Sequence, residues 1–159
     1  MAYHDDFLRR ALHLVHKEPR NPIQASLRRA VSTAYYALFH LLISEVANWS
    51  RVNLRTALGR AFDHSTMNAA SKRIQDKKKF PFTGEDPGVV LALREVAKAF
   101  AQLQEKRHTA DYDNTTFWTR TEALAQVKSA EQAFSAWKPI RHEQIAQAYL
   151  VSLVVKKRD

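Results

Sequence analysis

Apolar side chains recur at three- and four-residue steps along most of this chain, which is the pattern of amphipathic helices. A clear example is one face of the segment before residue 104, formed by Leu93, Val96, Ala97, Phe100 and Leu103. Residues 34–43 are apolar on nearly all sides, as expected of a helix that has neighbours around it. The pattern therefore predicts an all-α protein built around one central helix.

Prolines, cap residues and breaks in the apolar pattern set the helix boundaries. Asn21 with Pro22, and Asp86 with Pro87, each place a cap residue before a proline at the first helical position. The predicted helices cover 2–17, 21–49, 53–75 with a break near Gly59 or at 64–66, 87–112, a segment that follows Asn114 and Thr115 and ends at Pro139, and 140–155.

Long helices joined by short breaks favour antiparallel neighbours. We therefore expect an antiparallel helical bundle of four main helices plus one or two additional helices. The chain has 159 residues with only 3 glycines and 5 prolines, which argues against a sheet with many turns. We expect a single domain over residues 1–155, followed by a basic C-terminal tail at 156–159.

Several classes of function are disfavoured by what the sequence lacks. The absence of cysteine excludes disulfides and thiolate metal sites, and no glycine-rich phosphate loop is present. His13 and His16 stand at helical spacing without an obvious further ligand, so we expect no metal and no cofactor. No apolar run approaches the ~18 residues that span a bilayer, and no signal-peptide pattern is found. These features predict a cytoplasmic protein with no membrane partner.

The formal net charge of +9 is concentrated in one part of the chain. Residues 51–80 contain eight Lys or Arg against two Asp, a local balance of +6. Lys77, Lys78 and Lys79 form a basic loop that can attract phosphates, although a loop that merely keeps the protein soluble explains the same lysines. Arg60 and His64 are a further candidate pair in this block, for which a solvated helix face is the alternative.

The stripe of apolar residues that ends at Leu103 continues into charged residues. Arg107 and Asp111 point within ~20° of Phe100 around the same helix, at ~100° per residue. A cation and an anion that enter a core must be paired or must line a groove. Residues 107–113, which read Arg-His-Thr-Ala-Asp-Tyr-Asp, are therefore the leading site candidate.

A second polar strip lies on the predicted central helix, where Arg29, Thr33, Tyr36 and His40 share one face. Tyr36 and His40 have two interpretations. They are either a buried pair that shares one hydrogen bond, or part of the wall of a polar groove.

The chain resembles the HEPN family, named for a nucleotide-binding domain of higher eukaryotes and prokaryotes. The resemblance rests on residues 28–40, with the sequence RRAVSTAYYALFH, and on residues 107–113, and it covers roughly residues 5–137. It implies a helical bundle that dimerises so that two copies of the later helix form a shared groove. In catalytic members it also implies metal-independent RNA cleavage by an Arg and a His that stand four to six residues apart.

Carried onto this chain, the family's arginine falls on Arg107, whereas the matching histidine is missing. Asp111 or a neighbour takes its place, and His108 points about 100° away from Arg107 on the helix. A carboxylate there pairs with the arginine and repels phosphate. The resemblance is thus to the branch with an Arg-x-x-Ala-Asp-Tyr segment rather than to the Arg/His ribonucleases.

From this resemblance we expect a homodimer that binds RNA or a nucleotide-bearing partner, as a component of a toxin–antitoxin or defence system with a nucleotidyltransferase partner protein. In that role Arg107 contacts phosphate, while Asp111 and Tyr112 orient it or the dimer partner. One alternative is a metal-independent endoribonuclease in which His40, His64 or His108 supplies proton transfer. Another is a non-catalytic structural adaptor.

Overall fold

The computed structural model describes residues 2–49, 51–80, 83 and 85–156, and within these residues it contains helices and no strand. The all-α prediction is therefore confirmed. In chain order the elements are α1 (Tyr3–Val15), α2 (Gln24–Ala47), the 3-10 helix η1 (Val52–Leu54), α3 (Arg55–Gly59), α4 (His64–Gln75), α5 (Pro87–Tyr112), α6 (Arg120–Ile140) and α7 (Gln144–Val154).

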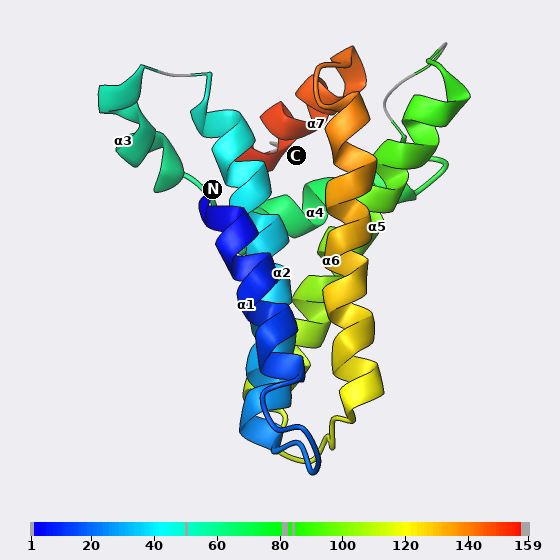
Figure 1. The fold of residues 1–159 in the computed structure, drawn as a ribbon. Coiled ribbons are helices and arrows are strands. Elements are labelled where there is room, and N and C mark those ends of the chain that lie inside the picture. The colour runs from blue at the N-terminus through cyan, green and yellow to red at the C-terminus, as the bar shows by residue number, and fades with distance from the viewer. Residues whose placement is uncertain (1, 50, 81–82, 84, 157–159) are drawn as a thin grey trace.

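Helices α1, α2, α5 and α6 form the bundle and run alternately down and up in Figure 1. The predicted antiparallel bundle of four main helices is thus present. Helix α2 packs against the other three, α4 lies at mid-height against α5, α7 lies toward the upper end, and α3 projects to one side (Figure 1). The predicted break near Gly59 is also confirmed, since α3 ends there and α4 begins at His64.

The predicted starts of α2, α6 and α7 are wrong, and α7 begins at Gln144 rather than at residue 140. The start at Pro87 is confirmed, with the Asp86 carboxylate accepting hydrogen bonds from the first backbone amides. Helix α2 begins at Gln24, so Asn21 and Pro22 lie before it. Helix α6 begins at Arg120, where Thr119 and Glu122 form a capping box.

The chain turns before α6 because the carboxylate of Asp113 accepts hydrogen bonds from Thr115 and Thr116. Phe117, which falls within the helix predicted after Thr115, instead lies in the connection and is 73% exposed. At the other end of α6, Pro139 stands in the last turn of the helix rather than terminating it. Residues 157–159 of the predicted tail lie outside the described residues.

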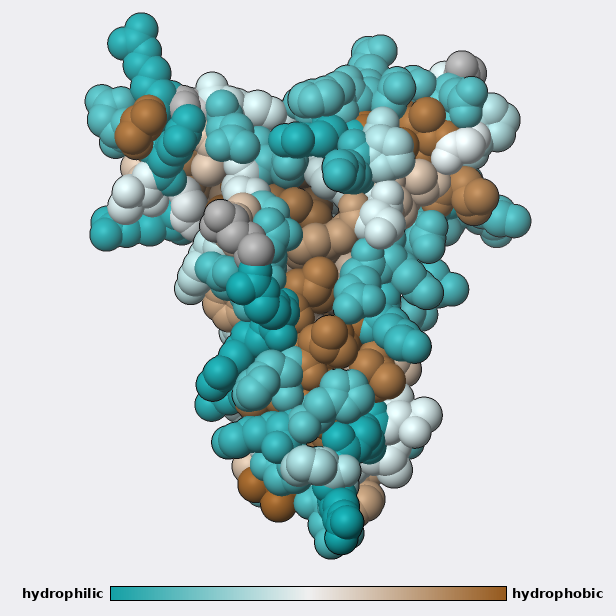
Figure 2. Space-filling view, in the orientation of Figure 1, coloured by the Kyte–Doolittle hydropathy of each residue, from teal (hydrophilic) through white to brown (hydrophobic). Residues whose placement is uncertain are grey.

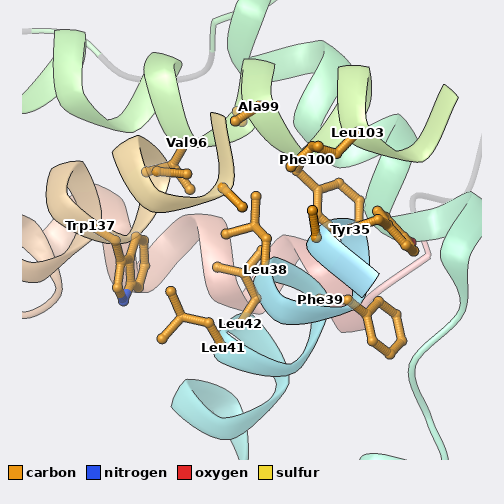
Figure 3. Close-up of a cluster of buried hydrophobic side chains, with 14 of the residues drawn as sticks. Tyr35, Leu38, Phe39, Leu41, Leu42, Val96, Ala99, Phe100, Leu103 and Trp137 are labelled. Carbon is orange, nitrogen blue, oxygen red and sulfur yellow. The ribbon is translucent and has the colours of Figure 1, made fainter. Parts of the chain in front are cut away.

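The core is a layer of large side chains from the three longest helices. Tyr35 and Leu38 come from α2, Phe100 and Leu103 from α5, and Trp137 from α6 (Figure 3). All five are almost completely buried, and Trp137 is 1% exposed. This layer holds α2 against α5, the helix that carries Arg107 and Asp111.

Helix α2 has the length and composition of a membrane-crossing helix, contrary to the prediction that no apolar run approaches that length. The structure buries 67% of this apolar window within the bundle. Contact with three neighbouring helices therefore accounts for its composition.

The lower end of the bundle is tied together by polar side chains of α2. The guanidinium of Arg28 donates hydrogen bonds to the backbone carbonyls of Ala110, Asp113 and Thr116. Gln24 pairs with the backbone of Trp118 in both directions, at 2.7 and 2.9 Å. Carbonyls at a helix C-terminus have no partner within the helix, so these bonds satisfy them and hold the 107–113 segment against α2.

Candidate functional site

Arg107 lies between α5 and α2, with its side chain 13% exposed. Its guanidinium carbon is 5.2 Å from the ring centroid of Tyr35 and 5.8 Å from that of Tyr36. One of its nitrogens is 3.6 Å from the carboxylate of Asp111, to which Ser32 also donates a hydrogen bond at 3.3 Å. The charge that interrupts the apolar stripe is thus held by two aromatic faces and one carboxylate.

Tyr35 links this arginine to a histidine from a different helix. The phenol of Tyr35 is completely buried, and its oxygen lies 2.6 Å from Nδ1 of His64, the first residue of α4. Burial raises the pKa of Tyr35 well above its usual value, so the phenol stays protonated. Either group can donate in this hydrogen bond; when the phenol donates, the hydrogen of the neutral imidazole is on Nε2, where it is a donor.

The imidazole of His64 is held in place by stacking on Phe39, with ring centroids 4.6 Å apart. Burial lowers the pKa of His64, and the positive charge of Arg107 lowers it further, against a smaller opposite effect of Asp63. With that tautomer the cluster offers two donors at neutral pH: the cationic guanidinium of Arg107 and the neutral Nε2–H of His64. An anion that reached both groups would be stabilised by Arg107 and would favour protonation of His64.

The structure divides the polar strip that was predicted on α2. Tyr36 stands between two histidines, with ring centroids 6.2 Å from His64 and 6.3 Å from His40. His40 lies on the far side of this group of rings from His64: it stacks on Phe7 at 5.0 Å, and its ring centroid is 5.3 Å from that of Phe39. Arg29 is exposed. Only Tyr36 of this strip joins the Arg107 cluster.

His40 lines a groove of about 680 Å³ between α1, α2 and α6. Figure 2 shows apolar surface between α1 and α6, flanked by hydrophilic side chains of both helices. His4 lies in the same groove and lowers the pKa of His40 in addition to the larger effect of burial. The structure therefore places His40 in a different site from Arg107.

The remaining predicted residues are exposed. His108 and Tyr112 are neighbours on α5, with ring centroids 5.0 Å apart, and Tyr112 is 67% exposed. Arg60 follows the projecting helix α3. The lysines at 77–79 occupy the turn after α4.

Two hollows connect the cluster to part of the basic block. A cleft of about 490 Å³ between α4 and α5 is lined by Arg107, His108 and Lys72. Lys72 also lines a hollow of about 400 Å³ together with Arg73 and Lys79. Lysines and arginines thus extend from the turn after α4 to Arg107, with the carboxylates of Asp76 and Glu105 among them.

Sequence reasoning left out Asn68 and Gln104, which line the same cleft. They are uncharged and match no motif, so composition and charge gave no reason to choose them. Their only signal was spacing, because His64, Asn68 and Lys72 follow one another at four-residue steps on α4.

Comparisons with protein-family models, with curated protein sequences and with solved structures found no match. Among the residues that the structure describes, no group of three or more His, Asp or Glu could hold a metal ion. The side chains of the cluster can bind an anion through Arg107, and they can form a hydrogen bond or transfer a proton through His64.

The two histidines with lowered pKa values make the stability of the protein depend on pH. Because His40 and His64 bind a proton less readily when folded, the unfolded chain takes up more protons below about pH 6.5. We expect the free energy of unfolding to be constant above that pH and to fall as pH decreases through it, by at most about 1.4 kcal/mol per pH unit for each histidine.

Urea unfolding at pH 5.5, 6.5 and 7.5 measures this dependence. His40→Gln should reduce the loss between pH 6.5 and 5.5, whereas replacement of the exposed His108 by Gln should leave it unchanged. A loss that is the same in wild type and His40→Gln would refute the assignment to His40.

Proposed function

We propose that this protein binds single-stranded RNA through its phosphates at the cluster of Arg107, Tyr35 and His64. The observation that carries the proposal is the meeting of Arg107 from α5 and His64 from α4 on the phenol of Tyr35. A guanidinium and an imidazole N–H are charge-assisted and neutral donors suited to phosphate oxygens. The choice of RNA rests on the resemblance to HEPN proteins.

Asp111 is the anion that phosphate must displace. Its carboxylate is 29% exposed and 3.6 Å from Arg107, a distance longer than that of a close ion pair. Such a pair holds the guanidinium in the unliganded protein without saturating its hydrogen-bonding capacity. Phosphate can replace the carboxylate without first opening a buried, tightly bonded pair.

The electrostatic surroundings support an extended polyanion rather than a single phosphate. Lys72, Arg73 and Lys79 line hollows that adjoin the cleft of Arg107. Cations spaced along a surface attract successive phosphates of a strand and release its counterions. Each such contact adds to affinity and to its dependence on salt.

The same resemblance supports a cytoplasmic homodimer and a nucleotidyltransferase partner protein within a toxin–antitoxin or defence system. In this proposal Tyr112 and His108, which are exposed at the end of α5, contact the partner or the second copy. Arg107 remains reachable from the cleft that His108 lines.

The proposal is tested by the affinity of the purified protein for a fluorescein-labelled 12-nucleotide RNA, measured by anisotropy between 50 and 200 mM salt. We expect log affinity to fall linearly with log salt, by about 0.7 for each phosphate contact on a single strand. Lys72→Ala should remove one contact and so lower both the affinity and this slope.

Lys128→Ala is the matched control, since it removes the same charge from an exposed position of α6. The proposal fails if the wild type shows no salt-dependent binding, or if Lys72→Ala and Lys128→Ala have equal effects. If Arg107→Ala then lowers only the melting temperature or the dimer fraction, the structural adaptor is the better description.

One observation favours metal-independent RNA cleavage as a second candidate function: the structure places His64, rather than His40, beside Arg107. Here Arg107 stabilises the charge on the phosphate, and the bound phosphate favours the protonated form of His64. The protonated His64 donates its Nε2 proton to the leaving 5′-oxygen while the ribose 2′-oxygen attacks phosphorus and its proton passes to water. Incubation of RNA with the protein in chelator tests it, with His64→Asn expected to abolish cleavage while RNA affinity changes only a few-fold. If the wild type leaves the RNA intact, binding alone is its function.

A further inference from the structure

The cleft between α4 and α5 extends from the Arg107 cluster along both helices. The two helices run in opposite directions, because His64 at the start of α4 lies near Arg107, while the last residue of α4 donates a hydrogen bond to a carbonyl further back along α5. Asn68 on α4 and Gln104 on α5 line the cleft about one helical turn, or about 5.4 Å, beyond the cluster. They therefore occupy the place that follows Arg107 along the cleft.

The side-chain amides of Asn68 and Gln104 present their nitrogens to this cleft. Oδ1 of Asn68 and Oε1 of Gln104 are buried and shielded from it, so Nδ2 and Nε2 are the accessible atoms. An amide nitrogen carries two hydrogens and acts only as a donor. The two residues thus offer uncharged hydrogen-bond donors to whatever enters the cleft.

Two cations stand in line with these amides. Lys72 on α4 brings its ammonium group to the cleft, and Arg107 brings its guanidinium. Gln75 also lines the cleft, but its Nε2 is occupied because it donates to two backbone carbonyls, one on each helix. Glu105 is the acidic residue of the lining; it is exposed, and its carboxylate repels phosphate toward the side of the two amides. That side of the cleft is a row of donors.

A row of donors fits the phosphates of a nucleic acid strand better than its bases. The oxygens of a phosphodiester only accept hydrogen bonds, and Asn and Gln side chains are among the groups that contact them in nucleic-acid complexes. The Watson–Crick edge of every nucleobase carries at least one N–H donor, which would meet a donor here. The chemistry of the cleft therefore selects the backbone of the strand, whatever its sequence.

We propose that Asn68 and Gln104 are phosphate-binding residues which, together with Lys72, hold the phosphate next to the one at Arg107. The inference rests on the proposed RNA binding and adds the course of the strand, which follows the α4–α5 cleft with its bases directed away from it. A strand advances at least about 3.4 Å per nucleotide, so the step of about 5.4 Å between the two sites accommodates successive phosphates. Binding at this subsite is independent of base identity.

Octamers of uridine, of cytidine and of abasic ribose phosphate provide the test, because they share the same backbone and differ only in the base. We expect the double variant Asn68→Leu/Gln104→Met to bind each octamer about tenfold more weakly than the wild type, as the loss of two uncharged hydrogen bonds requires. The slope of log affinity against log salt should stay unchanged, because uncharged groups release no counterions. Lys72→Ala, by contrast, should lower that slope by about 0.7.

Gln126→Met is the matched control, since it removes a half-buried amide from α6 and should change the affinity less than about twofold. A second measurement needs no variant. In an NMR titration of the wild type with the abasic octamer, the side-chain amide resonances of Asn68 and Gln104 should shift, whereas that of Gln126 should not. Amide resonances of Asn68 and Gln104 that stay in place while the octamer binds would overturn the subsite.

The outcomes separate this inference from the function on which it rests. Salt-dependent binding that is equally strong in the wild type and the double variant would overturn the phosphate subsite and leave RNA binding intact. A loss of affinity for the uridine or cytidine octamer without a loss for the abasic one would show that the two amides contact bases, which also overturns the subsite. Binding of none of the octamers by the wild type would overturn both the subsite and the proposed function.

Discussion

Replacement of Arg107 by alanine is expected to lower the affinity for single-stranded RNA about thirtyfold. The guanidinium is mostly buried over two aromatic rings, so its contacts with phosphate are weakened little by water. Charge-assisted hydrogen bonds of this kind contribute about 2 kcal/mol, which corresponds to that change in affinity. Anisotropy titration at one fixed salt concentration measures it.

Arg94→Ala is the matched control for this prediction. Arg94 is an arginine of the same helix, with its guanidinium carbon 4.6 Å from the ring centroid of Phe80, and thirteen residues of helix place it about 20 Å from Arg107. We expect its removal to lower the affinity for a short RNA less than about threefold. Equal losses in the two variants would show that α5 attracts RNA by general charge and not through the Arg107 cluster.

A second measurement on the Arg107→Ala variant tests the geometry without RNA. Since the charge of Arg107 lowers the pKa of His64, its removal should raise that pKa, as read from the imidazole resonances in an NMR titration. The stability should fall by about 1–2 kcal/mol, because the mostly buried guanidinium leaves two aromatic faces and the carboxylate of Asp111 without their partner. An unchanged pKa of His64 would contradict the close association of the two groups.

Replacement of Arg28 by alanine is expected to have the largest effect on stability, about 3 kcal/mol. Arg28 is the shared donor for three backbone carbonyls around the end of α5. Without it, carbonyls that are partly buried lose a charged donor and regain water only incompletely. For a chain of this length the loss corresponds to a decrease of about 6–12 °C in melting temperature, measurable by circular dichroism.

Arg29→Ala provides the control at the next position of the same helix, where the side chain is exposed. Its effect on the free energy of unfolding should stay within about 0.5 kcal/mol. If the two variants melt at the same temperature, the hydrogen bonds of Arg28 do not hold the lower end of the bundle. If Arg28→Ala also weakens RNA binding at temperatures where it is folded, those bonds position Arg107 as well.

The part of the candidate site that α5 carries could be located from sequence. The cap at Asp86, the proline after it and the continuous stripe through Phe100 predicted α5 from start to end. Along such a helix the angle between residues is known, so the entry of Arg107 and Asp111 into the bundle followed from the stripe itself. Their pairing, at 3.6 Å, is a local i,i+4 contact.

The starts of α2 and α6 could not be located in this way. Asn21 with Pro22 is a favourable local start, yet α2 begins at Gln24, whose side chain bonds the backbone of Trp118. Before α6, the carboxylate of Asp113 accepts hydrogen bonds from the hydroxyls of Thr115 and Thr116 and from the amide of Thr115. The helix begins only after the complete capping box at Thr119. The start of α2 is thus decided by a contact between distant segments, whereas at α6 two local signals compete and the capping box prevails.

What the sequence by itself determined is the set of helices, the antiparallel bundle and the position of Arg107 on an otherwise apolar face, because helical periodicity depends only on neighbours along the chain. Only the tertiary structure decided which histidine stands beside Arg107. His64, His40 and His108 were equivalent candidates in sequence, and the packing of α4 across α2 and α5 brought His64 to Tyr35 while His40 faces α1. Contacts between helices depend on how their apolar faces pack together, which no local spacing encodes.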